Sequence, residues 1–140
     1  FCTSVGEKLP CAVHIDSGMN RLGLSPSDVD AVAGADDLWS SLSLSLVMSH
    51  LACADDPSHG KNAEQRQRFD TLRARLPEAP TSLANSAGVL LGRDSAYDLV
   101  RPAMALHAAH PPHPCGNPFP RVHHPHPRIP PPRDPPPGAP

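Results

Sequence analysis

Aromatic side chains, lysine and long apolar runs are all scarce in this chain of 140 residues. Phe, Trp and Tyr together make up 4% of it, and Lys8 and Lys61 are its only lysines. No apolar run is long enough to cross a bilayer, and no basic and then apolar leader precedes the first apolar segment. We therefore expect no membrane insertion and no export, and a cytoplasmic location.

Charge and cysteine are limited as well, and each excludes a class of protein. The formal net charge is −2 with both signs interspersed, which leaves no basic footprint for DNA or RNA. The four cysteines lack Cys-x-x-Cys spacing, which favours free thiols over a metal site or a disulfide. Cys11 and Cys53 are interpreted as small apolar residues.

Proline is abundant by contrast, and it divides the chain in two. Most of the 20 prolines and 9 histidines lie in residues 110–140. This tail cannot supply the hydrogen bonds of a helix or a central strand, so we expect it to be disordered or polyproline-like. Its composition is also that of GC-rich DNA read out of frame, and we hypothesise a frameshift near residues 107–115. The start at Phe1 favours a piece of a longer protein.

Residues 1–109 alternate between strand and helix patterns. The apolar run 11–15 suits a buried strand, and Ser25 followed by Pro26 is typical of a helix start, with the helix running to about Ala33. Leucines that alternate with serines after Leu42 predict a second strand, which should end near Ser49 and His50.

A second helix is predicted after Asn62, which can cap it with Gln65 as the reciprocal partner. The apolar residues Phe69, Leu72 and Leu76 then fall on one face until Pro77 stops the helix. Residues 82–84 and 97–101 are predicted as further short strands. This alternation indicates a parallel α/β sheet.

Four polar residues fall at or just after the predicted strands: Arg21, His50, Ser86 and Arg101. In a β/α barrel the loops at the carboxyl ends of the strands converge on one mouth, so these side chains are expected to lie together. Four or five strands cannot close a barrel of eight, because open edges leave backbone groups unpaired. We therefore expect the chain alone not to fold stably.

Three segments resemble the bacterial alanine racemases, in the same order and at similar spacing. They are residues 14–23 (HIDSGMNRLG), 48–55 (MSHLACAD) and 83–88 (LANSAG). The resemblance covers roughly residues 10–106. It implies that residues 1–109 are the C-terminal part of the pyridoxal-phosphate-binding barrel domain of that family, a partial (β/α)8 TIM-type barrel of fold-type III.

The resemblance also implies roles for individual residues. Arg21 matches the arginine that approaches the cofactor's phenolic oxygen and helps to bind the substrate carboxylate, for which a planar and permanently charged guanidinium is suited. Arg101 matches the arginine that donates to the pyridine nitrogen, which limits the ring as an electron sink and favours simple proton removal and return. His50 matches the histidine that supports this second arginine.

Phosphate binding is implied for a second group of residues. Ser86 matches the serine whose hydroxyl holds the cofactor phosphate, and the backbone amides of Ala103 and Met104 match those of a second phosphate-binding turn. Asn85 is grouped with Ser86 as cofactor-binding, although the pair could be a plain helix cap. Ala103 replaces the family's usual glycine, and its methyl group could crowd the phosphate.

Other positions depart from the family pattern. His107 and Ala108 stand where Tyr-Gly is usual, which we interpret as sequence damage, and His14 stands where many relatives have lysine. The Schiff-base lysine and the catalytic tyrosine that racemisation needs have no counterpart, because Lys8, Lys61 and Tyr97 lie outside the matching motifs. No catalytic residue is therefore assigned in this chain.

The resemblance predicts a fragment of alanine racemase, an isomerase that uses pyridoxal 5'-phosphate to interconvert L- and D-alanine for peptidoglycan. The full-length parent would be a homodimer in the bacterial cytoplasm, and the fragment alone would be inactive. A broad-specificity racemase and a non-catalytic pyridoxal-phosphate-binding barrel are the alternatives within the fold. A different reading is a metal-binding tail built on His110, His113, His123, His124 and His126.

Overall fold

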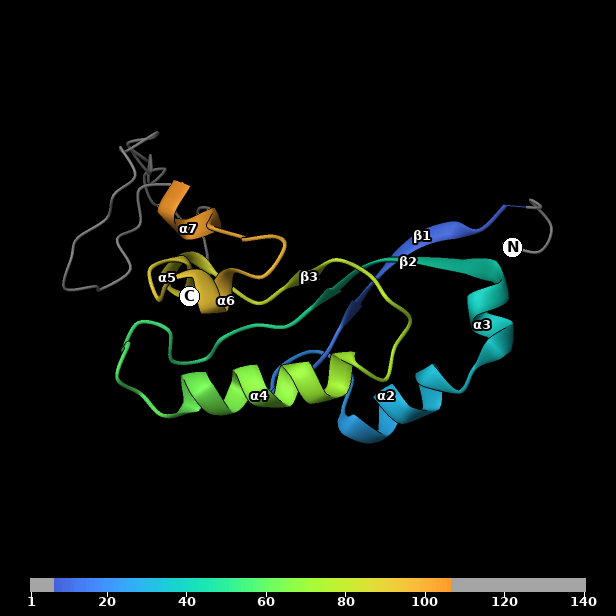
Figure 1. Cartoon of the computed structure of the whole chain (residues 1–140), viewed down its shortest axis with the longest axis horizontal. Helices are drawn as coiled ribbons and strands as arrows, with labels where there is room; N and C mark the ends of the chain where they lie inside the picture. The colour runs from blue at the N-terminus through green and yellow to red at the C-terminus, as the bar shows by residue number, and fades with distance from the viewer. Residues whose placement is uncertain (1–6, 107–140) are drawn as a thin grey trace, which may run out of the picture.

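The computed structural model describes residues 7–106, which form a small parallel sheet with helices along it (Figure 1). The predictions for residues 107–140 lie outside the described residues: the disordered tail, the frameshift, the histidine metal site and the departures at His107 and Ala108. Within residues 7–106 no helix has both the length and the apolar character that a bilayer crossing requires.

Three parallel strands form the sheet, in the order β1-β2-β3. They are β1 (Leu9–His14), β2 (Leu42–Met48) and β3 (Thr81–Ser82). The register pairs His14 with Met48 and Met48 with Ser82, so the carboxyl ends of all three strands lie at one edge. The predicted parallel α/β arrangement is confirmed.

Helix α2 (Pro26–Ala33) has the predicted bounds because its capping box is intact. Ser25 Oγ accepts a hydrogen bond from Asp28 N at 3.2 Å, and the Asp28 carboxylate accepts one from Ser25 N at 3.0 Å. Two donors that a helix start leaves unpaired are therefore satisfied within four residues.

Helix α4 (Lys61–Arg73) contradicts the predicted cap. Gly60 is its N-cap residue, and the Asn62 amide instead donates to Asp56 O at 2.9 Å. Gln65 cannot serve as a reciprocal cap because its side chain is fully buried under the sheet edge. The helix also ends at Arg73, ahead of the predicted stop at Pro77.

The segment 97–101 is not the strand that the sequence predicts. Asp98 N and Leu99 N both donate to the same carbonyl, Thr81 O, at 3.1 Å, so the regular spacing of a ladder is lost. Tyr97 has φ +54°, which breaks the extended conformation just before this point. Only an isolated bridge between Asn85 and Arg101 remains.

Four short helices complete the described residues, and the sequence indicated only the start of α5, as the helix cap left open for Asn85 and Ser86. They are α3 (Asp36–Ser41), α5 (Ser86–Val89), α6 (Arg93–Ala96) and α7 (Ala103–Leu106). At four to six residues, they are too short for an apolar periodicity to be read. Helices α5 and α7 begin at residues that the family resemblance assigns to phosphate binding, Ser86 and Ala103.

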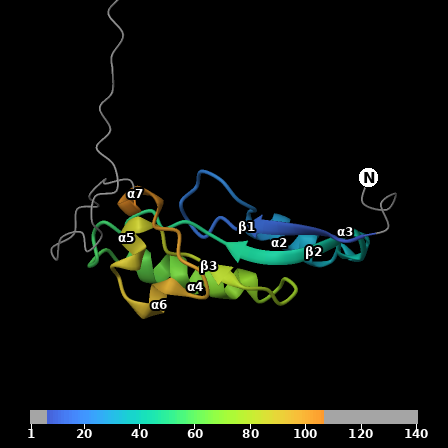
Figure 2. The same cartoon turned by 90° about the horizontal axis from the view of Figure 1, so that it is seen from above.

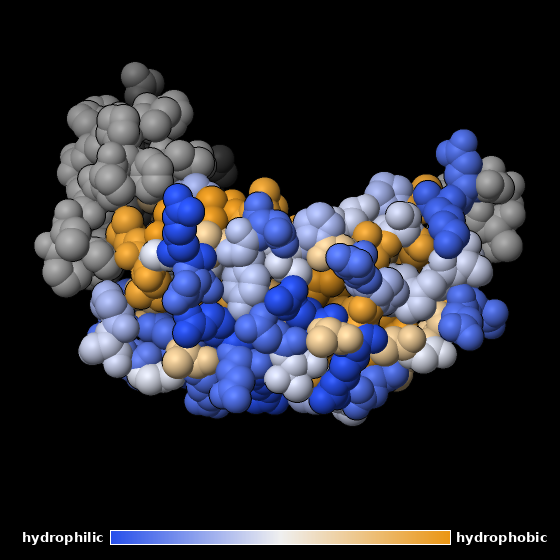
Figure 3. All heavy atoms as spheres, viewed as in Figure 1, coloured by the Kyte–Doolittle hydropathy of each residue, from blue (hydrophilic) through white to orange (hydrophobic). Residues whose placement is uncertain are grey.

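The core lies between the sheet and the helices α2 and α4, which cover the same face of it (Figures 1 and 2). Ile15, Val29, Phe69 and Leu83 are all 0% exposed in this layer. Figure 3 shows hydrophilic residues over much of the lower edge, where α2 and α4 lie, with hydrophobic residues gathered above them. Phe69 and Leu72 are buried on α4, which confirms that part of the expected apolar face, whereas Leu76 lies beyond the end of the helix.

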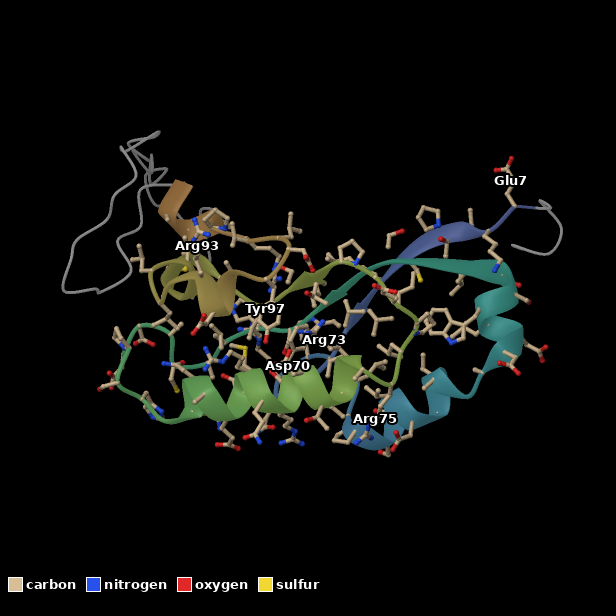
Figure 4. The ribbon with its side chains drawn as sticks, in the orientation of Figure 1. Glu7, Asp70, Arg73, Arg75, Arg93 and Tyr97 are labelled. Atoms are coloured by element: carbon tan, nitrogen blue, oxygen red, sulfur yellow. The ribbon has the colours of Figure 1, made fainter. Side chains whose placement is uncertain are left out.

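A polar cluster fastens the segment after α6 to α4 (Figure 4). The Tyr97 hydroxyl donates to Asp70 Oδ1 at 3.0 Å, and Arg73 Nε donates to the same oxygen at 2.9 Å. The Tyr97 ring meets Phe69 edge-on, with 5.4 Å between the ring centroids. Tyr97 is therefore a packing residue.

Candidate functional site

A cavity of about 350 Å³ opens beyond the carboxyl ends of β2 and β3. Its walls come from the loop after β2, from α5 and from the start of α7. The residues that line it are His50, Leu51, Ala52, Ala54, Asp55, Asn85, Ser86, Ala87, Arg101, Ala103 and Met104. Six of the seven residues that the sequence analysis singled out are in this set, and the seventh, Arg21, is not.

Arg101 joins the ends of two strands at the cavity wall. Its guanidinium donates to the Ser82 hydroxyl and to the carbonyl oxygen of Ser49. Ser82 in turn donates to Leu99 O at 2.7 Å, which ties it to the segment that leads to Arg101. Burial lowers the pKa of Arg101, but a guanidinium stays charged at any physiological pH. The cavity therefore contains a fixed cation whose orientation is held by neutral acceptors.

Ser82 is a site residue that the sequence analysis missed in this role. It was assigned only to a short strand, and its hydroxyl proves to be a direct partner of Arg101. No signal in the sequence marked it, because the predicted strand 82–84 begins at Ser82, whereas β3 ends there, at the edge where the carboxyl ends of the strands converge.

His50 is an uncharged imidazole at the cavity wall. Its Nε2 lies 3.2 Å from the Asn85 amide nitrogen, which can only donate, so Nε2 is the acceptor. Burial lowers the pKa of His50, and the positive charges of Arg101 and Arg21 lower it further. The family resemblance pairs His50 with Arg101, whereas in the structure its hydrogen-bond partner is Asn85.

Asn85 is the N-cap of α5 as well as a wall of the cavity. Its Oδ1 accepts from Gly88 N at 2.9 Å, and its Nδ2 donates to Leu51 O at 3.1 Å. A Cβ atom on Gly88 would lie 2.8 Å from Leu51 Cδ1, so a larger residue there would displace the Leu51 side chain. The helix-cap reading that the sequence left open for Asn85 is therefore correct, and it coexists with a place in the site.

Ser86 presents a hydroxyl group that can still donate. Its oxygen accepts from Ala105 N at 3.1 Å, and the residue is 5% exposed. The resemblance also assigns phosphate binding to the backbone amides of Ala103 and Met104, and the surroundings of these two residues differ. Ala103 N donates to Arg101 O at 2.9 Å, whereas Met104, at the start of α7, lines the cavity with a side chain that is 58% exposed.

The turn between β1 and α2 holds Arg21 beside this edge. Gly23 has φ +113°, and a Cβ atom there would lie 2.6 Å from Asp16 N, so only glycine fits. Asp16 Oδ1 accepts from Gly18 N at 2.9 Å and from Asn20 N at 3.0 Å. Burial of Asp16 acts to raise its pKa, but these hydrogen bonds outweigh it and the pKa is lowered. The turn is thus rigid.

Arg21 itself is exposed on this turn and does not line the cavity. It lies on the turn that follows β1, at the same edge of the sheet as the cavity, and its charge lowers the pKa of both His14 and His50. The structure thus gathers six predicted residues around one cavity and leaves Arg21 at its approach.

Comparison with known proteins gives one family. The model of the alanine racemase N-terminal domain matches residues 2–111. The catabolic alanine racemase of Mesorhizobium japonicum is 50% identical over 106 residues, which are 76% of this chain and 28% of that protein. The alanine racemase of Rhizobium meliloti is 53% identical over 98 residues, which are 70% of this chain and 26% of that protein.

Solved structures give the same result. Alanine racemase from Bartonella henselae, with covalently bound pyridoxal phosphate, has a TM-score of 0.74 at 35% identity and covers 81% of this chain and 33% of its own. The biosynthetic alanine racemase of Pseudomonas aeruginosa has a TM-score of 0.65 at 31% identity and covers 78% of this chain and 31% of its own. The chain thus spans about a quarter to a third of the length of the relatives it matches.

Proposed function

Because the chain belongs to the alanine racemase family through its N-terminal domain, we propose that the cavity binds pyridoxal 5'-phosphate and that the parent protein interconverts L- and D-alanine. The observation that supports this most is the convergence of six residues, assigned from the family motifs alone, on one cavity. The relative from Bartonella henselae, which carries this cofactor, matches the fold over 81% of the chain.

The groups around the cavity fit this cofactor. A dianionic phosphate needs donors, and the Ser86 hydroxyl is one whose hydrogen has no acceptor among the described residues. A pyridine nitrogen is an acceptor, and Arg101 is a donor that never loses its charge. The neutral His50 adds no second positive charge to the wall. The chain therefore offers a phosphate donor and a ring donor in one cavity.

When it is bound, pyridoxal phosphate withdraws electrons from the α-carbon of an amino acid, which acidifies the proton there. The role of Arg101 is to keep the ring nitrogen unprotonated, since a guanidinium can donate a hydrogen bond but does not give up its proton. Arg21, on the approach to the cavity, would bind the carboxylate of the substrate. Both assignments are part of the proposal.

Other parts of the proposal concern the parent protein. We propose that residues 1–109 are part of a (β/α)8 barrel, that the parent is a homodimer in the bacterial cytoplasm, and that its D-alanine enters peptidoglycan. The given sequence contains neither the lysine motif nor the tyrosine motif that the resemblance requires. We therefore expect the chain by itself not to racemise alanine.

Equilibrium dialysis with the full chain tests the binding step. Pyridoxine 5'-phosphate is the better probe, because it has no aldehyde that would react with Lys8 or Lys61. Ser86→Ala should weaken its binding about tenfold, as expected for a hydrogen bond to a charged group. Ser45→Ala removes an exposed serine on β2 and should have no effect. Equal affinities of the two variants would contradict the assigned phosphate donor.

A transplant tests the catalytic step. Residues 7–106 would replace the matching segment of a full-length relative, which supplies the lysine and the tyrosine. We expect alanine racemisation that Arg21→Ala or Arg101→Glu abolishes. Binding of the cofactor without racemisation in the unmutated transplant would favour the non-catalytic binding protein instead.

A further inference from the structure

Gln65 is a fully buried polar residue on the apolar face of α4. Its Oε1 accepts a hydrogen bond from Ala52 N at 2.8 Å, and its Nε2 donates to His50 O at 3.0 Å. A third contact joins Nε2 to Ser17 Oγ at 3.4 Å. The amide therefore binds the loop after β2 on both sides of Leu51 and reaches the loop after β1.

Two buried serines extend this network to the cavity. Ser17 and Ser49 are 0% and 1% exposed, and their hydroxyl oxygens lie 2.7 Å apart. The carbonyl oxygen of Ser49 accepts from the guanidinium of Arg101. A continuous series of contacts therefore runs from Gln65 through both serines to Arg101.

A side-chain amide is neutral and carries its acceptor and its donors on two separate atoms. Ala52 N supplies the donor and His50 O supplies the acceptor, so the two ends of the amide are assigned without ambiguity. A hydrocarbon side chain of the same length would leave both of these partly buried backbone groups without their partners, which costs free energy. The loop would then move until those groups found other partners or water.

We propose that Gln65 is a positioning residue for the cavity: it fixes the backbone from His50 to Ala52, and thereby the His50 ring and the carbonyl that orients Arg101. The inference rests on the proposed function, because the cavity that Gln65 positions is the proposed cofactor site. The Gln65 amide forms its hydrogen bonds with backbone atoms of His50 and Ala52 and with the Ser17 hydroxyl. None of these groups is one by which the proposed ligand would be recognised.

Gln65→Met in the full chain, with Gln67→Met as the matched control, tests the inference. Gln67 lies on the same helix and its side chain is exposed. The first readout is the pKa of His50 from NMR titration of its ring protons. His14 is the internal comparison, because burial and the charge of Arg101 also lower its pKa but Gln65 does not contact it.

We expect the pKa of His50 to rise by about half a unit or more in Gln65→Met, since a loosened loop admits water to the ring. The pKa of His14 should change less than that of His50, and both values should stay unchanged in Gln67→Met. The second readout is the affinity for pyridoxine 5'-phosphate, which should fall about tenfold in Gln65→Met alone. An unchanged His50 pKa in a folded Gln65→Met variant would overturn the inference.

Ser17→Ala covers the case in which Gln65→Met does not fold. This smaller change removes one contact of Gln65 and one of Ser49, and it should raise the pKa of His50 more than that of His14. No shift in Ser17→Ala would overturn the inference equally. If the unmutated chain does not bind the probe, the proposed function fails, whereas the His50 readout still decides the role of Gln65.

Discussion

Asn85→Ala is the substitution whose effect can be worked out most fully from the structure. Asn85 caps α5 by accepting from Gly88 N at 2.9 Å, and loss of such a cap costs about 1 kcal/mol. Its Nδ2 also donates to Leu51 O at 3.1 Å, and Leu51 is 2% exposed. Leaving that carbonyl without a donor costs roughly 1 kcal/mol more. The free energy of unfolding should fall by about 2 kcal/mol in all.

Asn62→Ala is the matched control for this prediction. Asn62 donates a single hydrogen bond, to Asp56 O at 2.9 Å in an exposed loop, and its Oδ1 has no partner among the described residues. Its replacement should therefore cost less than about 1 kcal/mol. Urea unfolding of the two variants, followed by far-UV circular dichroism, measures the difference. Equal losses of stability would refute the reasoning.

The same substitution should change the titration of His50. In the structure the Asn85 amide donates to Nε2, which favours the neutral ring. Without it the pKa of His50 should rise toward its ordinary value, as NMR titration would detect. A pKa that stays equally low in Asn85→Ala would show that burial and the arginine charges alone account for it.

Three further predictions concern the turn, the aromatic cluster and pH. Gly23→Ala should lower the thermal midpoint strongly, because its Cβ atom would overlap Asp16 N, whereas Gly60→Ala, with nothing within 4 Å, should not. Tyr97→Phe should lower the free energy of unfolding by about 1.5 kcal/mol, since the hydroxyl donates to a carboxylate. Burial and that carboxylate raise the pKa of Tyr97, so in an absorbance titration its phenol should ionise above the ordinary range. The stability that the protonated phenol contributes should be lost as the pH rises through this raised pKa of the folded state. Because the pKa of His50 is lowered, the unfolded chain binds more protons between that pKa and the ordinary value, and thermal stability should be lower at about pH 5.5 than at about pH 7.5.

The sequence patterns predicted the structure correctly where the interactions join residues that are close together in the chain. Helix α2 has its predicted bounds because Ser25 and Asp28 satisfy each other within four residues. The strand after Leu42 was predicted from an alternation that a pleated backbone imposes by itself. The position of the site was predicted for the same kind of reason, since the carboxyl ends of parallel strands share one edge.

The predictions failed where a distant partner competed with a local one. Asn62 was expected to cap α4 with Gln65, but Gln65 instead bonds backbone groups of the loop after β2. Residues 97–101 were expected to form a strand, but the Asp98 carboxylate accepts from Thr81 N at 2.8 Å and takes the donor that a regular ladder would use. Such pairings join residues 13 to 17 positions apart, which no local pattern encodes.

The sequence alone therefore determined the alternation of strands and helices, the edge at which the polar residues gather, and the family. It did so because periodicity, caps and motifs are properties of neighbouring residues. The tertiary structure determined which groups within the site meet: that Ser82 holds Arg101, that Asn85 faces His50, and that Gln65 lies beneath both loops. Those choices depend on which donors and acceptors are buried together, and burial is settled only when the sheet and α4 pack.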